Sequence, residues 1–407
     1  MTNLLWPGDH RAGELMSDRA LLESMVAVES AWLHALAAAG LAPADAAGVD
    51  LRCLVGPPDS DMLALAAEDG GNPVIGLVAL LRERAGPPVG RWIHRGLTSQ
   101  DVLDTALMLA VREAIDSLTS QLAEQISALS ALASAHRGTP MVARTLTQHA
   151  VPTTFGAKVA GWLNGVVDAA SQLAALSSPV QIGGAGGTLA ATTELATLSG
   201  AGGVEVSLRL VETTAAALGL DIRMPWHTAR APVTLAADAL VGCTDAWGHI
   251  ASDVVTLARP EIAELSEPAT ADRGKSSSMP GKRNPVLAIL IRRAAVAAPA
   301  LAATLHTAAA LVHDERPDGA WHAEWDTLRT LARRAVVASS QCTELLAGLV
   351  VHPERMAANL DAVDVLGEQR AVAELAGTNP AATYFGAVDA LIDASLDRAR
   401  GVLKEHR

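Results

Sequence analysis

The sequence predicts an all-α fold. Alanine and leucine dominate the 407 residues, whereas aromatic residues make up only 3%, with one tyrosine and two phenylalanines. Alanine and leucine favour helices, while strands are enriched in aromatic and β-branched residues. Apolar residues also recur at helical spacing over long stretches that glycine and proline interrupt. We therefore expect long helices packed in a bundle.

Residues 1–110 are expected to form an N-terminal domain of mixed helices. The first residues contain Pro7, Gly8 and Gly13 and predict irregular chain. Apolar residues at helical spacing then predict a helix over 18–39 that ends at Gly40, where glycine is the usual terminator. Several shorter helices, separated by proline and glycine, are expected over 41–90.

Residues 111–350 are expected to form a central bundle with helices longer than the usual ~11–12 residues. The predicted long helices cover residues 99–136, 154–178, 232–258, 285–313 and 321–350, and a shorter one covers 204–219. Their alanine- and leucine-rich surfaces exceed what one chain buries easily, so we expect several subunits to pack together. Residues 351–407 predict a small C-terminal helical domain.

Two junctions in this plan have specific structural expectations. Thr98, with Asp101 three positions later, resembles a capping box at the start of helix 99–136. The glycine cluster 183–187 lacks the spacing of a dinucleotide-binding loop, so it predicts a close backbone approach or a bent helix junction instead.

Composition restricts the classes of partner and the compartment. The net charge of −13 argues against nucleic acid and acidic membranes as partners. Cys53, Cys243 and Cys342 are far apart without metal-ligand spacing, so we expect buried thiols in a reducing compartment. The first residues do not have the pattern of a signal peptide, and charges such as Arg292 interrupt the apolar helices. The expected location is the cytoplasm.

The stretch 272–285 is the strongest candidate for a functional segment. It is polar and cationic, it separates two long apolar helices, and it holds two of the four lysines, Lys275 and Lys282, around three consecutive serines. A serine between two ammonium groups near a helix start could handle negative charge. A flexible surface connector is the alternative that composition alone favours. Asn284 and Pro285 predict the cap and first position of the next helix.

Metal binding is not expected. His313, Glu315 and His322 are near one another in the sequence, but their spacing matches no metal-binding pattern. Neither a metal nor any other cofactor is predicted.

Three segments carry a family resemblance. Residues 276–285 resemble the S-S-x-M-P-x-K-x-N-P signature of the fumarase/aspartase superfamily, although Lys275 stands where glycine is usual. Residues 94–105 resemble its H-x-G-x-T-S-x-D-x-x-D-T segment, and residues 141–163 resemble a further block. The resemblance implies the three-domain helical fold of that superfamily, tetramers whose sites draw on three chains, and addition or elimination beside a carboxylate.

Within the superfamily, three other segments resemble the 3-carboxy-cis,cis-muconate cycloisomerases. They are the Q-x-G-G-A-x-G-T-L segment at 181–189, the P-W-H-T-x-R segment at 225–230 and the E-R-x-x-G-x-W-x-A-E-W segment at 315–325. This resemblance implies closure of 3-carboxy-cis,cis-muconate to 4-carboxymuconolactone in protocatechuate degradation, without a cofactor. One substrate carboxylate would add to a double bond, and the resulting aci-carboxylate would be protonated.

The resemblance also implies roles for individual residues. Ser276 would carry the proton, and Lys282 and Asn284, beside Met279, would bind the carboxylate that becomes the aci form. A second carboxylate would contact Thr98, Ser99 and Gln148. Arg316 and His227 would anchor a third carboxylate or would otherwise be surface or interdomain residues. His94 would be a donor on the site wall or a structural residue, and His149 a site residue or a packed histidine at a helix start. Lys158 would face the site by analogy.

Two other functions stay open. Adenylosuccinate lyases share the Thr-Ser and serine-loop segments, but their catalytic histidine is replaced by Leu146, and their upstream His-Asp pair has no counterpart in residues 71–78. A catalytically silent helical tetramer is the other alternative, against which the intact set of Ser276, Lys282 and Asn284 argues.

Overall fold

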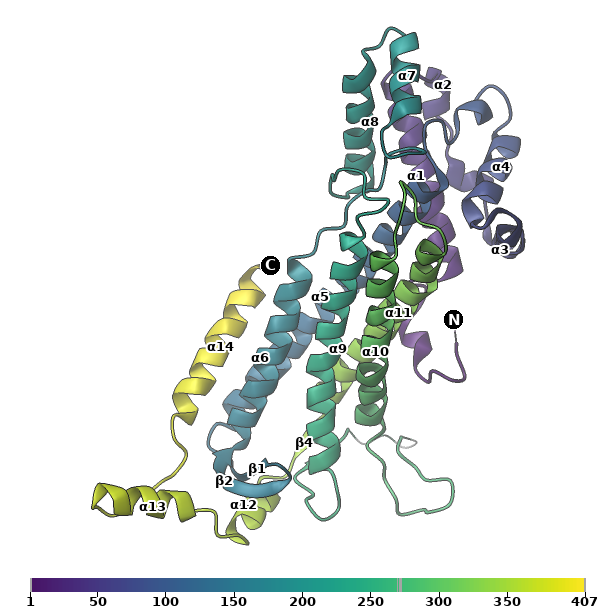
Figure 1. Cartoon of the computed structure of the whole chain (residues 1–407). Coiled ribbons are helices and arrows are strands. Elements are labelled where there is room, and N and C mark those ends of the chain that lie inside the picture. Colours follow the sequence, from purple (N-terminus) through teal and green to yellow (C-terminus); the bar gives the residue numbers. More distant parts are fainter. Residues whose placement is uncertain (1, 269, 271–272, 406–407) are drawn as a thin grey trace. The chain divides into compact units, whose positions relative to one another are not determined.

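The computed structural model describes residues 2–268, 270 and 273–405, and it is mainly helical (Figure 1). Helices account for 65% of the structure, and the described part contains fourteen α-helices, three short 3₁₀-helices and four short strands. The predicted all-α class is therefore confirmed. Asp272, the first residue of the candidate segment 272–285 (the serine loop), lies outside the described residues.

The chain divides into two compact units that alternate along the sequence. Unit 1 contains residues 1–116, 176–238 and 300–333, and unit 2 contains 117–175, 239–299 and 334–407. The long helices α5 (Ser99–Ala135), α9 (Ala231–Leu257), α10 (Val286–Ala310) and α11 (Gly319–Ala347) contribute residues to both units. The division into domains 1–110, 111–350 and 351–407 remains a prediction.

Unit 1 is built around the helices of the N-terminal region. Its other elements are η1 (Asp9–Ala12), α1 (Asp18–Ala38), α2 (Ala44–Ala47), η2 (Leu51–Leu54), α3 (Pro57–Gly70), α4 (Pro73–Ala85), η3 (Gly90–Trp92), α7 (Ala190–Leu198) and α8 (Gly203–Leu218). Helix α1 supplies the wholly buried Trp32 and Leu36, and α4 supplies Leu77 and Leu81 to the same core. As predicted, α1 ends before Gly40, whose φ is +71°.

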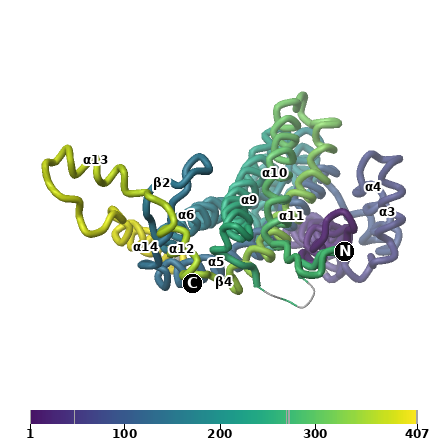
Figure 2. Tube along the Cα trace, turned by 90° about the horizontal axis from the view of Figure 1, so that it is seen from below, coloured from purple at the N-terminus to yellow at the C-terminus, as the bar shows by residue number. Residues whose placement is uncertain are grey.

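Unit 2 contains α6 (Phe155–Ala174), β3 (Leu265–Ser266), β4 (Val350–Val351), α12 (Pro353–Asp361), α13 (Gly367–Ala376) and α14 (Val388–Glu405), besides its parts of the long helices. Helix α14 lies along α6, where Asn164 donates to Ser395 and Arg398 pairs with Asp168 (Figure 2). The predicted C-terminal helices are thus present, and one of them is fixed to the central bundle.

A β-hairpin connects α5 to α6. Strands β1 (Pro140–Thr145) and β2 (Gln148–Thr154) pair antiparallel, with a bulge between Val142 and Arg144. Only Leu146 and Thr147 connect the strands, and both have positive φ angles, +48° and +71°. A two-residue hairpin loop of the favoured twist needs positive φ at both positions. The sequence analysis did not predict these strands.

The thiols only partly follow the prediction. Cys243 and Cys342 are buried, and burial raises the pKa of the Cys243 thiol to about 12. Cys53 is exposed, so the prediction that it is buried was wrong. It lies in the short η2 helix, of which only Leu51 packs fully into the core.

Two helices of the described chain, α1 and α10, are long and apolar enough to span a membrane by length and composition alone. More than half of the apolar window of α1 is buried within the protein (56%), as in the core helices of water-soluble proteins. The corresponding window of α10 is only 33% buried, so this helix leaves apolar surface uncovered by its own chain.

A buried glutamine connects three of the long helices within unit 2. Gln125 on α5 accepts a hydrogen bond from Trp247 Nε1 on α9 at 2.7 Å. Its amide nitrogen donates to the carbonyl and hydroxyl of Ser339 and to the hydroxyl of Thr343, all on α11, at 3.0–3.2 Å. Because Trp247 and Ser339 are buried, the indole N–H and the Ser339 hydroxyl depend on this side chain for their polar contact.

We expect Gln125→Leu to lower the free energy of unfolding by about 2–4 kcal/mol, because the indole N–H and the Ser339 hydroxyl lose their partner. Thermal unfolding of the purified protein, followed by circular dichroism, would measure the loss. Gln121→Leu is the matched control on α5, since Gln121 Oε1 already lacks a partner in the described chain and its Nε2 reaches only Ser117 at 3.4 Å. Equal midpoints for the two variants would contradict this account.

Candidate active site

The serine loop is closed at its base by a glycine and an asparagine. The Gly274 carbonyl accepts from the Asn284 amide N–H at 2.9 Å and from Asn284 Nδ2 at 3.1 Å. Gly274 has a φ of +76°, and a Cβ atom on it would lie 2.5 Å from the Asn284 carbonyl oxygen. Only glycine fits this position without displacing the loop.

The substitution of lysine for the usual glycine does not strain the loop. Lys275 pairs with Arg283 as a bridge of antiparallel strands, and it is not among the described residues with positive φ. A backbone in the ordinary region accepts a side chain freely. The glycine that this loop requires is therefore Gly274, one position earlier.

Ser276 sits where negative charge on its oxygen would be stabilised. Its Oγ accepts from the backbone N–H groups of Met279 at 3.1 Å and Ser278 at 3.4 Å. Two amide donors that converge on one oxygen favour its anionic form. Met279 is 51% exposed and Lys282 is also exposed, so the loop presents these side chains away from the core of unit 2.

A cavity of about 370 Å³ adjoins the base of the loop within unit 2. Its lining includes Glu267, Arg273, Arg283 and Asn284. Burial raises the pKa of Glu267, although backbone N–H groups of α10 and the charge of Arg273 act in the opposite direction. The cavity thus combines two arginines with a carboxyl group that is protonated more easily than usual.

Glu267 also corrects the predicted start of α10. Its carboxylate accepts from the amides of Leu287 at 3.0 Å and Ala288 at 2.7 Å, and so it caps the helix. Asn284 was predicted to be this cap, but its side-chain amide donates to Gly274 instead. The cap comes from a residue about twenty positions away, which local sequence rules do not consider.

The hairpin presents the other unit 2 candidates. Gln148 is exposed, and its amide donates to the neighbouring Thr147 hydroxyl at 3.2 Å. Leu146 is 96% exposed at the tip of the turn, and His149 is exposed beside it. Lys158 on α6 is already paired with Asp253 at 3.2 Å.

In unit 1, the start of α5 is organised by Asp101. The carboxylate accepts from the Thr98 amide at 2.9 Å, which is one half of the predicted capping box. It also accepts from the amides of Gly183 at 3.0 Å and Gly184 at 2.9 Å, and it is fully buried. The glycine cluster thus approaches the Thr98–Ser99 turn closely, as predicted.

His227 and Gln181 complete the set of donors to this carboxylate. His227 Nε2 lies 2.9 Å from Asp101 Oδ1, and Gln181 Nε2 donates to the same oxygen at 3.2 Å. The His227 ring is 3% exposed, and a Cβ on Gly183 would lie 2.8 Å from it. His227 is therefore not the surface residue that was one alternative, and its contact with Asp101 makes it part of the support of the α5 start.

A second buried cluster surrounds Arg230. Its guanidinium donates to Asp104 at 2.6 and 3.1 Å and to both oxygens of Glu324, and Trp321 Nε1 donates to Asp104 at 2.8 Å. Burial opposes the charge of Arg230, but the two carboxylates raise its pKa above the ordinary value. For Glu324, burial raises the pKa, although the neighbouring Arg230 acts to lower it.

The remaining unit 1 candidates lie on either side of these clusters. His94, four residues before Thr98, contacts the buried Glu29, with Nδ1 2.6 Å from Oε1. Arg316 is half-buried between α10 and α11, without an ion pair in the part of the chain that the structure describes. His94, Thr98 and Ser99 belong to unit 1, in the turn before α5 and at the start of this helix, whereas Ser276, Lys282 and Gln148 belong to unit 2.

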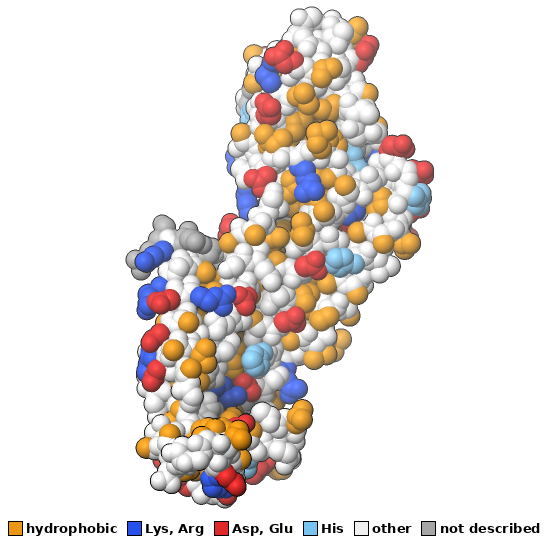
Figure 3. All heavy atoms as spheres, turned by 60° about the vertical axis from the view of Figure 1, so that its left-hand side comes forward, with side chains coloured by type: hydrophobic (Ala, Val, Ile, Leu, Met, Phe, Trp, Pro, Cys, Tyr) orange, Lys and Arg blue, Asp and Glu red, His pale blue; other side chains and the backbone are white. Residues whose placement is uncertain are grey.

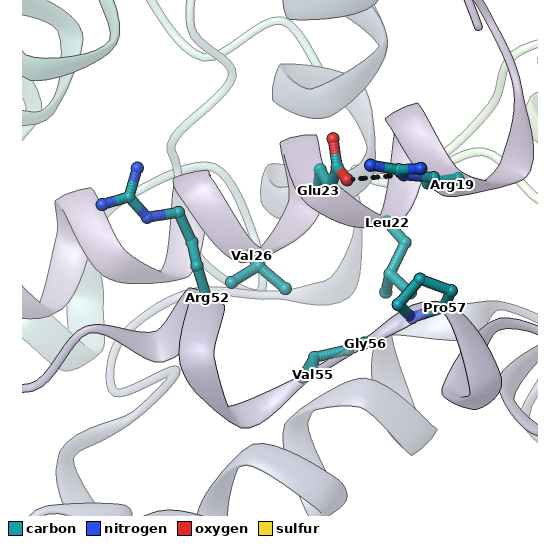
Figure 4. A pocket seen from close by; sticks show the side chains of 8 residues that line it. All are labelled: Arg19, Leu22, Glu23, Val26, Arg52, Val55, Gly56 and Pro57. Atoms are coloured by element: carbon teal, nitrogen blue, oxygen red, sulfur yellow. Dashed lines mark hydrogen bonds and ion pairs between the residues drawn. The ribbon is translucent and has the colours of Figure 1, made fainter.

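Sequence reasoning missed the hub formed by Asp101, because it assigned this residue only to a helix cap. A further cavity in unit 1, of about 240 Å³, is a weaker candidate (Figure 4). Its floor is apolar, and its cations have partners, since Arg19 pairs with Glu23 at 2.9 Å and Arg52 with Asp50 at 2.9 Å. These exposed pairs leave little charge to attract a ligand.

Comparisons with known proteins support the family resemblance of these segments. The sequence pattern of the family described as "Lyase" matches residues 66–299. The chain is 46% identical to nitrosuccinate lyase of Streptomyces davaonensis, over 85% of this chain and 74% of that protein. It is 41% identical to 3-carboxy-cis,cis-muconate cycloisomerase of Bradyrhizobium diazoefficiens, over 94% and 83% of the two chains. The solved 3-carboxy-cis,cis-muconate lactonizing enzyme of Pseudomonas putida has a TM-score of 0.82 at 32% identity, over 97% of this chain and 86% of that one.

We expect Gly274→Ala to lower turnover at least about 100-fold with little change in the thermal midpoint. The added Cβ would push Asn284 away and open the base of an exposed loop, which misplaces groups without uncovering the core. Gly281→Ala is the control in the same loop, because a Cβ there meets no described atom within 4 Å. Equal activities of the two variants would rule out this role for the loop base.

Proposed function

The chain belongs to the lyase family of the fumarase/aspartase superfamily, and from this premise we propose that it closes 3-carboxy-cis,cis-muconate to 4-carboxymuconolactone. Relatives that carry the name of this cycloisomerase, at 41% and 37% identity, support the proposal. The reaction is an isomerisation, so every atom of the substrate is retained in the product.

One observation carries the proposal. The three segments that resemble the cycloisomerases all supply partners to the two buried carboxylates at the start of α5. Asp101 is bonded by Gln181, Gly183, Gly184 and His227, and Asp104 is bonded by Arg230 and Trp321. These residues therefore support the turn that we propose to bind a substrate carboxylate, which makes the segments relevant to its geometry.

The proposed chemistry begins with a carboxylate of the substrate. One of its oxygens attacks a double-bond carbon and forms the C–O bond of the lactone, while the displaced electron pair moves into a neighbouring carboxylate as the aci form. Lys282 and Asn284 would stabilise this charge. Ser276 would then deliver its proton to carbon, because two backbone N–H groups stabilise the oxyanion that remains.

A second candidate is elimination of nitrite from nitrosuccinate. The relative named nitrosuccinate lyase, at 46% identity, favours it. The same residues would act in the opposite sense: Ser276 would accept the proton from carbon, the C–N bond would break, and its electron pair would leave with nitrite. Both candidates use an aci-carboxylate and differ in the bond that forms or breaks.

An adenylosuccinate-type elimination has less support. A departing amine needs a proton from a general acid, whereas carboxylate and nitrite are stable as anions. Leu146 stands where adenylosuccinate lyases have their catalytic histidine, and it has no proton to give. A silent tetramer is the remaining alternative, and turnover measurements decide it.

Ultraviolet assays of the purified protein with 3-carboxy-cis,cis-muconate, nitrosuccinate and adenylosuccinate test the proposal directly. We expect turnover of the first and a loss of about 10²–10⁴ in Ser276→Ala, as for a positioned proton donor. Ser277→Ala, at the adjacent hydroxyl, is expected to stay within about tenfold of the wild type. Turnover of nitrosuccinate alone would replace the first candidate by the second, and no turnover of any of the three would favour the silent tetramer.

We also propose assembly into a homotetramer with shared sites. On α10, Ile289 is 46% exposed and Val296 79%, and Leu311 directly after this helix is 64% exposed, an unusual apolar surface for this part of the central bundle. Apolar side chains are also widespread on the face shown in Figure 3. A second copy would bury this surface and bring in residues from another chain.

We expect Val296→Glu to reduce the assembly to smaller species and to abolish turnover, because it would place a charge in the subunit interface. Light scattering coupled to size exclusion would measure the mass. Leu4→Glu, at a residue that is 98% exposed near the N-terminus, is the control and should leave the mass unchanged. A wild-type mass of one chain would contradict the proposal.

A further inference from the structure

One buried carboxylate of unit 1 has no role in the site described above. Glu29 on α1 is fully buried between the core residues Val28 and Trp32, which are also fully buried. Its Oε2 has no hydrogen-bond partner in the described chain. A carboxylate in an apolar core is unfavourable unless a specific partner compensates, so its single contact requires an explanation.

That contact is with His94. Glu29 Oε1 lies 2.6 Å from His94 Nδ1, which makes a short, charge-assisted hydrogen bond. His94 has a φ of +64°, a left-handed conformation that is uncommon for residues other than glycine, although histidine adopts it more often than most. The surrounding structure must therefore hold the residue in place.

The backbone on both sides of His94 is fixed by side chains from neighbouring helices. Arg82 on α4 donates to the Ile93 carbonyl, at 2.9 Å from Nη2 and 3.3 Å from Nε. Trp32 on α1 donates to the Arg95 carbonyl at 2.7 Å. Together with Glu29, these contacts determine both the backbone and the ring orientation of His94.

The other ring nitrogen stays available. His94 Nε2 has no partner among the described residues and is not one of the buried unpaired atoms, and the side chain is 16% exposed. The contact of Nδ1 with Glu29 determines which nitrogen faces outward. His94 lies four residues before Thr98, in the turn that leads into α5.

We propose that Glu29 is a positioning residue that holds the His94 ring with its Nε2 directed at a carboxylate of the substrate. The inference rests on the proposed function, since it deepens the site at Thr98 and Ser99. Glu29 fixes the ring through Nδ1, and a ring that carries both protons donates from Nε2 to a carboxylate more strongly than a neutral donor does. The site would therefore prefer small molecules with two or more carboxylates.

Binding of fumarate to the full-length protein, measured by calorimetry, tests the inference without requiring turnover. Glu29→Gln keeps the size of the side chain and an acceptor oxygen but removes the charge. His94→Asn keeps a residue that tolerates the left-handed backbone but removes Nε2. We expect each variant to weaken fumarate binding at least about tenfold, as for the loss of a hydrogen bond to a charged group.

The double variant distinguishes positioning from a purely structural role. If Glu29 acts through His94, the Glu29→Gln/His94→Asn protein binds fumarate within about twofold of His94→Asn alone. In turnover assays the same variants should raise KM far more than they lower kcat, because the contact is made with bound substrate as well as with the transition state. Additive effects, or unchanged fumarate binding in either single variant, would overturn the inference.

Two matched control variants test whether the effect is specific to the Glu29–His94 pair. Ser24→Ala removes a buried hydroxyl from the same helix α1, and His306→Asn changes an exposed histidine that pairs with Asp238 at 2.9 Å in unit 1. Both should bind fumarate as the wild type does. If Glu29→Gln does not fold, Glu29→Met removes the same charge at similar length and is judged by the same criterion.

The two proposals fail in different ways. Absence of turnover of all three substrates would remove the proposed function, while coupled losses of fumarate binding would still support the Glu29–His94 dyad. If the wild type does not bind fumarate, the inference is wrong even where 3-carboxy-cis,cis-muconate is converted.

Discussion

The interaction on which the described site depends is the set of hydrogen bonds to the Asp101 carboxylate. Five donors converge on its two oxygens, from the Thr98, Gly183 and Gly184 amides, the Gln181 side chain and the His227 ring. A buried carboxylate is stable only with such partners. The requirement fixes the start of α5, the glycine cluster and the segment before α9 relative to one another, so these remote parts of unit 1 form a single support.

The same requirement explains the other polar clusters. Arg230 pairs with Asp104 and Glu324, and all three side chains are buried. Removing one partner would therefore leave a buried charge uncompensated. Glu264 in unit 2 is similar, since it is fully buried and paired with Arg144 at 2.7 Å. Glu29 differs from all of these, because its Oε2 has no hydrogen-bond partner among the residues that the structure describes. This difference is why we assign it a role beyond stability.

Sequence reasoning predicted the fold well because long helices have a strong local signal. The apolar spacing of 18–39 and the glycine that follows it were sufficient to place α1, and the Thr98–Asp101 spacing identified the start of α5.

Prediction from the sequence failed where the partners of a residue are distant in the chain. Two of the donors to Asp101, Gly183 and His227, lie 82 and 126 positions away from it. Glu267, which caps α10, lies 20 positions before Leu287. The hairpin was missed because its strands are only six and seven residues long and contain Pro140 and Pro152, which are unusual within strands. The exposure of Cys53 depends on packing around a short helix, which has no periodicity to reveal it.

The hairpin turn makes chemistry and stability separable in this protein. Leu146 is 96% exposed at the tip of a two-residue turn, so its side chain supports no part of the core of its own chain. Another residue could occupy this position with little effect on folding. If the tip residue takes part in the proposed chemistry, a change of leaving group would need few substitutions, because the helices would be retained while the residue at the tip changes. Divergence of new activities, in nature or by directed evolution, could begin at this turn.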